Sequence, residues 1–255
     1  MNSEPEEEDL TPLADCSLCG FQETLLVEGR CKRGDCCVVA ESGRQIDRFF
    51  RANPSLAPNY AADAFWERRA IAARYLPTSQ LEAMLNDPDE VVRRVLAYRL
   101  PIDMLERLSN DTDREVRITV ADRLPVEKLE IMANDPDYLV RTYVAKRLPK
   151  GRLFRLVADP DNQVRRTVVE RIPSVSLGLM VNDNEVTIRR IVAERMDPED
   201  LVLISKDSDW TVRYEVATRA PLDLLQTMLD DPEEDVRELA RQRFESLSQA
   251  IESNE

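Results

Sequence analysis

All the thiols of this chain lie in one short stretch near its N-terminus. The stretch "CSLCGFQETLLVEGRCKRGDCC" contains Cys16, Cys19, Cys31, Cys36 and Cys37, and no cysteine follows it. Cysteines gathered in this way can form disulfides, bind zinc or hold an iron–sulfur cluster. Five is an odd number for disulfides, and disulfides are rare in the cytosol, where we expect this protein to work. A metal site is therefore favoured.

The spacing of the cysteines narrows the choice of metal only slightly. The CxxC pair of Cys16 and Cys19 suits zinc and a cubane cluster equally. Structural zinc sites commonly add a second CxxC pair, whereas here Cys31 stands alone and Cys36 and Cys37 follow a glycine-containing turn. Uneven spacing suits a cluster whose four irons are approached separately. Because the side chains of neighbouring residues diverge, we expect only one of Cys36 and Cys37 to be a ligand.

The composition excludes several classes of protein. The chain has no histidine, so Ser-His-Asp and Cys-His catalysis, Cys2His2 zinc fingers and HExxH metalloproteases are ruled out. It also lacks a Walker loop, a GxGxxG phosphate loop and the CxxxCxxC motif of radical-SAM enzymes. We therefore predict that the protein is not an enzyme.

Charge and hydropathy bear on location and partners. The N-terminus "MNSEPEEEDL" is acidic where a signal peptide would be basic and then apolar, and no apolar run approaches the length of a membrane span. The net charge of −14, with 5 lysines against 30 arginines, argues against nucleic-acid or anionic-membrane binding. We expect a cytoplasmic protein that binds neither.

A repeat of 24 residues occupies most of the remaining chain. Seven units follow one another without insertion or deletion, at residues 76–99, 100–123, 124–147, 148–171, 172–195, 196–219 and 220–243. A worn eighth unit precedes them, with Asp63 and Arg69 at matching offsets. A fixed period of this size predicts a solenoid, in which each unit buries its apolar face against its neighbours.

Each unit contains the signals of one main helix. An aspartate, often followed by proline, recurs before the helical pattern, at Asp87, Asp111, Asp135, Asp159, Asp183, Asp207 and Asp231. We expect it to cap the helix, with proline at the first helical position. Apolar residues such as Val92, Leu96 and Ala97 then define one buried face. A pair such as Leu100-Pro101 ends the helix, because proline disfavours helical geometry in the residue before it.

The remainder of each unit is short. Apolar residues spaced i, i+3, such as Leu105 and Leu108, or Leu129 and Met132, predict one or two turns of 3₁₀ character. No strand pattern occurs in the repeats. The predicted unit is thus one α-helix of about ten residues and one short helix.

Two sets of arginines recur with the repeat. One lies inside the helix (Arg93, Arg117, Arg141, Arg165, Arg189, Arg213, Arg237) and the other at its end (Arg99, Arg123, Arg147, Arg171, Arg195, Arg219, Arg243). They could line a groove for phosphates or acidic partners. We favour a structural role, in which the first set pairs with the aspartates of the next unit and the second complements a negative helix end. Binding residues are then expected at positions that vary between units.

The unit "LPxxxLxxMxxDPDxxVRxxVAxR" resembles the leucine-rich repeat variant (LRV) of bacterial proteins. The resemblance covers residues 52–243 and implies an all-α, right-handed superhelical solenoid of alternating α- and 3₁₀-helices. The segment "CSLCGFQETLLVEGRCKRGDCCVVAESGRQIDRFF" is similar to the N-terminal segment with which some members bind a [4Fe–4S] cluster.

The resemblance also implies a set of cluster ligands, namely Cys16, Cys19, Cys31 and Cys37. In the family segment a turn leads into Cys-Val, which matches Cys37-Val38. Cys36 is the alternative fourth ligand, and zinc is the alternative metal. The remaining thiol would be a small free residue.

The chain accordingly divides into four predicted parts. They are an acidic tail (1–15), a cysteine-rich cluster lobe (16–51), the repeat solenoid (52–243) and a polar C-terminal cap (244–255). Ile46, Phe49 and Phe50 follow the cysteines at helical spacing. We expect them to dock the lobe onto the first repeat; an aromatic conduit for electrons is the alternative.

The predicted function is a non-enzymatic scaffold that carries an iron–sulfur cluster and binds a protein partner, whose identity the sequence leaves open. An electron carrier that docks to a redox enzyme, a redox or oxygen sensor, a zinc-capped scaffold and a nucleic-acid-binding solenoid are the alternatives. Capped ends favour a monomer.

Overall fold

The computed structural model describes residues 11–252, which form helices joined by short loops except for a long non-helical stretch at residues 19–42. The chain forms two compact units, Met1–Pro125 and Val126–Glu255. The helices of the first unit are η1 (Cys16–Leu18), α1 (Gly43–Ala52), η2 (Pro54–Tyr60), α2 (Trp66–Tyr75), η3 (Thr78–Met84), α3 (Glu90–Arg99), α4 (Ile102–Leu105), η4 (Glu106–Leu108) and α5 (Arg114–Arg123). Those of the second are η5 (Leu129–Met132), α6 (Tyr138–Arg147), η6 (Lys150–Leu156), α7 (Asn162–Val169), η7 (Ser174–Met180), α8 (Val186–Arg195), η8 (Pro198–Leu203), α9 (Trp210–Arg219), α10 (Leu222–Met228) and α11 (Glu234–Glu252).

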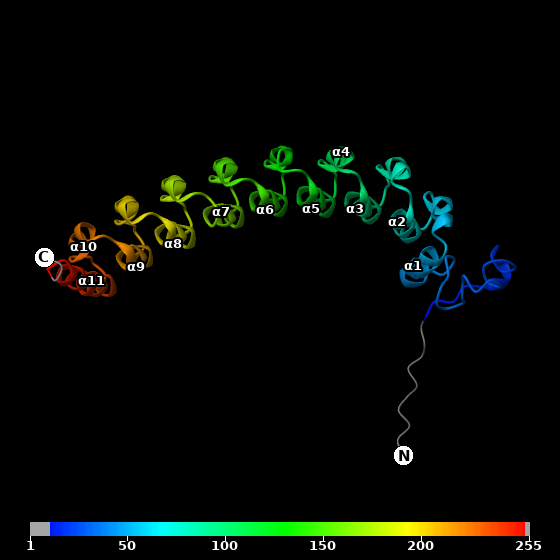
Figure 1. Cartoon of the computed structure of the whole chain (residues 1–255), viewed down its shortest axis with the longest axis horizontal. Helices are drawn as coiled ribbons and strands as arrows, with labels where there is room; N and C mark the ends of the chain where they lie inside the picture. The colour runs from blue at the N-terminus through cyan, green and yellow to red at the C-terminus, as the bar shows by residue number, and fades with distance from the viewer. Residues whose placement is uncertain (1–10, 253–255) are drawn as a thin grey trace, which may run out of the picture. The chain divides into compact units, whose positions relative to one another are not determined.

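The predicted all-α repeat fold is confirmed. Within each unit the longer helices lie side by side in one layer and the short helices form a second layer (Figure 1). Most short helices are 3₁₀, while α4 and α10 are α-helical. Over residues 11–252, pairing of the β type is limited to one isolated bridge, between Lys32 and Cys36.

The core lies between the two layers. Val92, Leu96 and Ala97 of α3 are fully buried, as the apolar pattern predicts, and so are Leu105 and Leu129 of the short-helix layer. Leu100 follows the last residue of α3 and adopts an extended conformation (ψ 144°). The helix therefore ends at the Leu-Pro pair, as predicted.

The predicted helix cap is wrong by two residues. Helix α3 begins at Glu90, and its cap is Asp89, whose carboxylate accepts the N–H of Val91. The same displacement occurs at α5, α6, α7 and α9. Asp87 instead accepts the N–H of Asp89 at 2.9 Å, so it shapes the turn before the helix, and Pro88 lies in that turn.

The first arginine set pairs with the recurring aspartates, as predicted. In six pairs, the arginine donates through Nε and one terminal nitrogen to both oxygens of the aspartate 18 residues later, at 2.7–3.0 Å. These pairs are Arg69–Asp87, Arg93–Asp111, Arg141–Asp159, Arg165–Asp183, Arg189–Asp207 and Arg213–Asp231. These aspartate side chains are only 3–7% exposed. Consecutive repeats are thus joined by largely buried, bidentate ion pairs.

The charges within these pairs are stabilised by their partners. The carboxylate of Asp111 raises the pKa of Arg93 through their hydrogen bonds, against the opposing effect of burial. Burial by itself raises the pKa of Asp111, but hydrogen bonds from Arg93 and from the N–H of Asp113 outweigh it, and the net pKa is lowered. Both members of the pair are therefore held in their charged forms.

The second arginine set reaches back to the preceding repeat. Arg99 donates to the carbonyls of Ala73 and Leu76, at the C-terminal end of α2. Arg123, Arg171, Arg195, Arg219 and Arg243 likewise donate to a carbonyl 26 residues earlier. The predicted role is confirmed, with the detail that the helix end belongs to the neighbouring repeat.

The C-terminal residues extend the last helix. Helix α11 continues without a break across the predicted boundary at residue 243, so residues 244–252 form its last turns. Most of the predicted acidic tail (residues 1–10), together with residues 253–255, lies outside the described residues.

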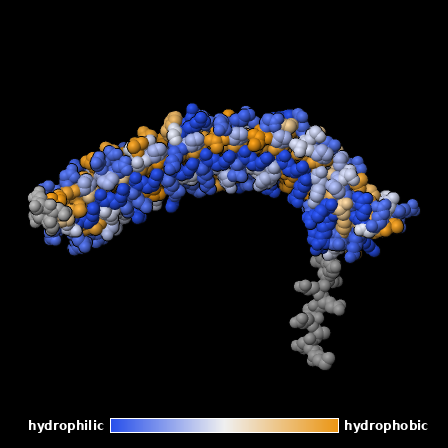
Figure 2. All heavy atoms as spheres, viewed as in Figure 1, coloured by the Kyte–Doolittle hydropathy of each residue, from blue (hydrophilic) through white to orange (hydrophobic). Residues whose placement is uncertain are grey.

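The surface of both units is mostly hydrophilic (Figure 2). In the second unit, apolar side chains gather on the short helices, where Val175, Leu179, Val202 and Leu203 are 59–82% exposed. Among residues 11–252, none of the helices has the length and apolar character needed to cross a bilayer.

The ion pairs between repeats predict that substituting an arginine lowers the free energy of unfolding only where that arginine belongs to such a pair. Replacing Arg165 with alanine should lower the free energy of unfolding by about 3 kcal/mol, because Asp183 would keep a buried, unpaired carboxylate. Its neighbour Arg166 is exposed and, within the described part of the chain, has an ion pair only with the exposed Glu170 at the end of the same helix. Arg166→Ala should therefore change stability by less than about 0.5 kcal/mol. Urea denaturation followed by circular dichroism compares the two variants, and equal midpoints would contradict a stabilising role for the pair.

Candidate iron–sulfur site

The five cysteines lie on loops and on one short helix of the first unit. Cys16 begins η1, and Cys19 follows its end, where its N–H donates to the Cys16 carbonyl at 3.2 Å. Cys16, Cys19, Cys31 and Cys36 are partly exposed, whereas Cys37 is 9% exposed and packs with Ala14 and Ala40. The thiol of Cys36 donates to the Arg30 carbonyl at 3.5 Å.

A tight turn separates Cys31 from the last two cysteines. The N–H of Cys36 donates to the Lys32 carbonyl at 2.9 Å, and the N–H of Lys32 donates back to the Cys36 carbonyl at 2.7 Å. Gly34 has a φ of +75°, a conformation that glycine adopts without strain. A Cβ there would also lie 3.0 Å from the side chain of Leu13. The turn therefore requires glycine at this position.

Two buried amide side chains, one in α1 (Gln45) and one on the residue that caps its C-terminal end (Asn53), hold the cysteine segment in place. Gln45 donates from Nε2 to the Pro12 carbonyl at 2.8 Å, and its main-chain carbonyl accepts the N–H of Cys37 at 3.1 Å. Asn53 donates from Nδ2 to the carbonyl of Arg30 at 2.9 Å. Both amides are fully buried. The helix thus fixes the chain before Cys16, next to Cys31 and at Cys37.

The sequence prediction missed both amides. A signal was nevertheless present: Gln45 and Asn53 are polar residues at helical spacing around the apolar Ile46, Phe49 and Phe50. Buried polar groups of this kind are retained where they satisfy a specific backbone group.

The predicted docking by the apolar face of α1 is confirmed. Ile46, Phe49 and Phe50 are at most 1% exposed. The ring of Phe49 lies 5.6 Å from that of Phe21, which lies between Cys19 and Cys31. Phe50 packs 5.4 Å from Tyr60 and 6.1 Å from Tyr75, on the first repeats. These contacts join the cysteine segment to the repeats.

Cys31 occupies a central electrostatic position among the cysteines. Burial raises the pKa of its thiol, and the negative charges of Cys19, Cys36, Cys37 and Cys16 raise it further. The thiolate of Cys31 is therefore disfavoured until a positive group lies beside it.

Tyr60 also lies near the site. Burial raises the pKa of its phenol, followed by the negative charges of Cys19 and Asp63. The aromatic residue that packs on Phe50 is thus also close to the cysteine segment.

The donor set fits an iron–sulfur cluster. The site offers thiols and no imidazole, since the chain contains no histidine, and thiolates are the usual ligands of such clusters. Among residues 11–252, no three side chains of the Cys, Asp, Glu or His types form a group that could hold a single metal ion. A cubane does not require such a group, because its four ligands bind irons at separate corners. Positive iron would also favour the Cys31 thiolate.

A stacked all-α repeat with a thiol-only N-terminal segment defines an iron–sulfur repeat protein. A family model described as "LRV protein FeS4 cluster" matches residues 12–59, and one described as "Leucine rich repeat variant" matches residues 114–137 and 138–161. The segment at residues 12–59 is therefore a [4Fe–4S] cluster segment.

A solved structure is similar to this chain over most of its length. The chain is 56% identical to a solved leucine-rich repeat variant "with a novel repetitive protein structural motif", with a TM-score of 0.80, covering 91% of this chain and 99% of the other. The chain belongs to the leucine-rich repeat variant family. It is also 39% identical over 100 residues to an uncharacterized 27.7 kDa protein from the nifB 3′ region of Rhodobacter capsulatus. That match covers 39% of this chain and 40% of the relative, so it spans about two fifths of each.

The identities of the four ligands stay a prediction, and single substitutions test them. Cys16→Ser, Cys19→Ser, Cys31→Ser and Cys37→Ser should each lose most of the iron, because each removes one thiolate of the set. Cys36→Ser should retain it. Iron and sulfide per chain, measured after anaerobic purification, provide the comparison. Retention by Cys37→Ser together with loss by Cys36→Ser would make Cys36 the fourth ligand.

The buried Asn53 predicts a coupling between α1 and the cysteine segment. Asn53→Ala should destabilise the first unit by about 1–3 kcal/mol, because the fully buried amide would be lost and the Arg30 carbonyl would keep only the weak Cys36 thiol as a donor. The iron content should fall as the chain next to Cys31 becomes less ordered. Asn59, six residues later on η2, is exposed, so Asn59→Ala is the matched control and should change neither property. Thermal unfolding and iron analysis of both variants test this, and unchanged iron in Asn53→Ala would argue against the coupling.

Proposed function

We propose that the protein is a non-enzymatic scaffold whose repeats bind a protein partner and whose N-terminal segment carries the cluster as its redox-capable group. The observation that carries the proposal is the use of the recurring charges. In six places, a recurring arginine and a recurring aspartate are engaged in an ion pair between repeats. The cysteine segment is therefore the part of the chain suited to chemistry, and the variable exposed side chains are suited to recognition.

A protein is the proposed class of partner for the repeats. The exposed apolar residues Val175, Leu179 and Val202 suit a protein surface better than a nucleic acid. The net charge of −14 also opposes binding to a polyanion. We further propose that the protein acts as a monomer in the cytoplasm, where thiols stay reduced.

Two redox roles are compatible with the proposed scaffold. When bound, the cluster supplies a centre that accepts and releases one electron. The ring of Phe49 lies 5.6 Å from that of Phe21 and 5.6 Å from that of Phe50. This series of rings leads from the cysteine segment toward the first repeats, which favours an electron carrier. Alternatively, the buried amides of α1 hold the segment, so loss of the cluster would disturb α1, which favours a sensor.

Metal analysis and electron paramagnetic resonance test the proposal. We expect the anaerobically purified protein to contain about four irons and four sulfides per chain and no stoichiometric zinc. Addition of dithionite should produce a reduced-state signal that disappears on reoxidation. One zinc per chain without sulfide would overturn the cluster and leave a zinc-capped scaffold.

Exposure to air separates the two redox roles. A carrier should cycle repeatedly with its helical circular dichroism unchanged. A sensor should lose iron in air and change the unfolding of the first unit at the same time. A cluster that neither cycles nor leaves would contradict both roles and indicate a structural metal centre.

A further inference from the structure

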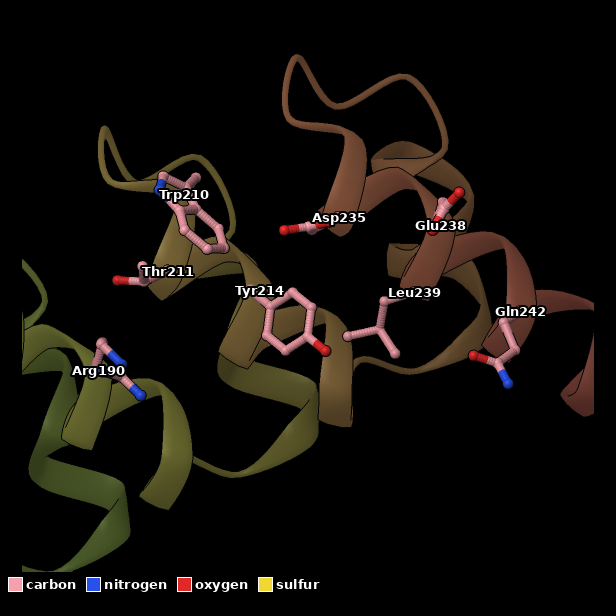
Figure 3. A pocket seen from close by; sticks show the side chains of 8 residues that line it. All are labelled: Arg190, Trp210, Thr211, Tyr214, Asp235, Glu238, Leu239 and Gln242. Atoms are coloured by element: carbon pink, nitrogen blue, oxygen red, sulfur yellow. The ribbon is translucent and has the colours of Figure 1, made fainter.

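A pocket of about 500 Å³ lies on the layer of longer helices in the second unit. Its lining includes Arg190 of α8, Trp210 and Tyr214 of α9, and Asp235, Glu238 and Leu239 of α11 (Figure 3). None of these residues belongs to the recurring ion pairs. They lie at positions that vary between repeats, where binding residues are expected.

The pocket combines aromatic rings with carboxylates. The rings of Trp210 and Tyr214 lie 6.4 Å apart and nearly perpendicular, at 84°. Both residues remain exposed in part, at 42% and 38%. Asp235 and Glu238 come from the facing helix, on the α11 side of the two rings (Figure 3). An electron-rich ring face beside carboxylates is an environment that attracts an organic cation.

The repeat itself provides a comparison for this pocket. Trp66 occupies the same position of the 24-residue unit as Trp210, six repeats earlier, and is 39% exposed. The residues that correspond to Tyr214, Asp235 and Glu238 are there Ala70, Val91 and Arg94.

The tryptophan therefore recurs without the second ring and without the acids. Tyr138 also occupies this position, with Thr142, Gln163 and Arg166 at the corresponding places. Among these three aromatic positions, the combination of two rings and two acids occurs only around Trp210.

We propose that this pocket binds an arginine side chain on an exposed segment of the protein partner, flanked by apolar residues. The proposal rests on the proposed function, in which the repeats bind a protein. A guanidinium can stack on an aromatic face while donating to a carboxylate at its edge. Leu239 and the ring edges provide an apolar surface for the neighbouring residues.

Arg190 gives the site a direction. It lies on the α8 side of the two rings, away from Asp235 and Glu238 (Figure 3). A cation should therefore enter on the α11 side, where the carboxylates lie, and be repelled on the α8 side. The two acids outnumber the single base, so the pocket as a whole complements a positive charge.

Fluorescence of the single remaining tryptophan tests the proposal. Trp66 and Trp210 are the two tryptophans of the chain, so Trp66→Phe makes Trp210 the reporter of the pocket, and Trp210→Phe makes Trp66 the matched control. The probe is the peptide acetyl-Ala-Leu-Arg-Leu-Ala-amide, titrated into the full chain at low salt. The same peptide with citrulline in place of arginine keeps the shape and removes the charge.

We expect saturable binding of the arginine peptide in the Trp66→Phe protein, weakened by added salt. The citrulline peptide should bind at least about tenfold more weakly, which corresponds to about 1.4 kcal/mol. Combining Asp235→Asn with Glu238→Gln should produce a similar loss, with circular dichroism confirming that α11 is intact. The Trp66 reporter should not respond.

Several outcomes would overturn the proposal. They are equal binding of both peptides, binding that the two acid substitutions leave unaffected, and an equal response of Trp66. The absence of a saturable signal up to about 5 mM peptide would also contradict it, because a weaker affinity would not suffice for recognition. Iron and sulfide content of the same samples judges the cluster scaffold separately. If the peptide does not bind but the cluster is present, only the proposal for this pocket is contradicted. If the cluster is absent, the proposed function is contradicted.

Discussion

The bidentate ion pair between consecutive repeats is the interaction on which the stacking depends. An arginine inside one helix reaches the aspartate 18 residues later, in the turn before the next helix, so each pair joins two neighbouring repeats in the same way. The arginine also donates to a carbonyl in the turn before its own helix, as Arg165 does to Asp159. One guanidinium therefore joins the turns of two repeats. Because the pair is largely buried, it tolerates neither partner being lost, and this explains why both residues recur.

This use of charge separates structure from recognition along the chain. The charged residues that recur are committed to stacking, together with the arginines that satisfy the carbonyls of the preceding helix. Positions that face solvent on the longer helices are free to differ, and they carry tryptophan, tyrosine, arginine or acid in different repeats. A solenoid built in this way can change its surface at one repeat without disturbing the next, since stability is a sum of neighbour interactions.

Much of the fold could be predicted from the sequence because the period is invariant. The same positions are apolar in each repeat. The pattern therefore predicts the burial of Val92, Leu96 and Ala97, and it predicts that the helix ends at Leu100. The cap was misplaced for a physical reason. "DPD" offers two aspartates, and the helix begins after the second, because the first is occupied by the arginine of the preceding repeat.

The cysteine segment was less predictable because it has no repeat to average over. The cysteines and the docking face of α1 were evident from residue type and spacing. The amides that hold the segment were not, since Gln45 and Asn53 act on the carbonyls of Pro12 and Arg30, which are distant in sequence. The helical spacing of these amides is visible in the sequence, but it does not indicate which remote backbone group each one binds. The sequence leaves the choice between Cys36 and Cys37 as the fourth ligand open for the same reason.

Helix α1 connects the two kinds of structure, because it serves the cysteine segment and the repeats through different residues. Its amides bind the backbone near the cysteines, while Phe50 packs against Tyr60 and Tyr75 of the first repeats. A change in the cysteine segment that moves Gln45 or Asn53 must therefore be accommodated by the same helix that packs on the repeats. A well-packed interface of large rings resists small displacements, so such a change either is absorbed within the segment or shifts α1 as a body. A change absorbed within the segment suits a cluster that only exchanges electrons. A shift of α1 as a body suits a cluster whose state changes the structure of the repeats.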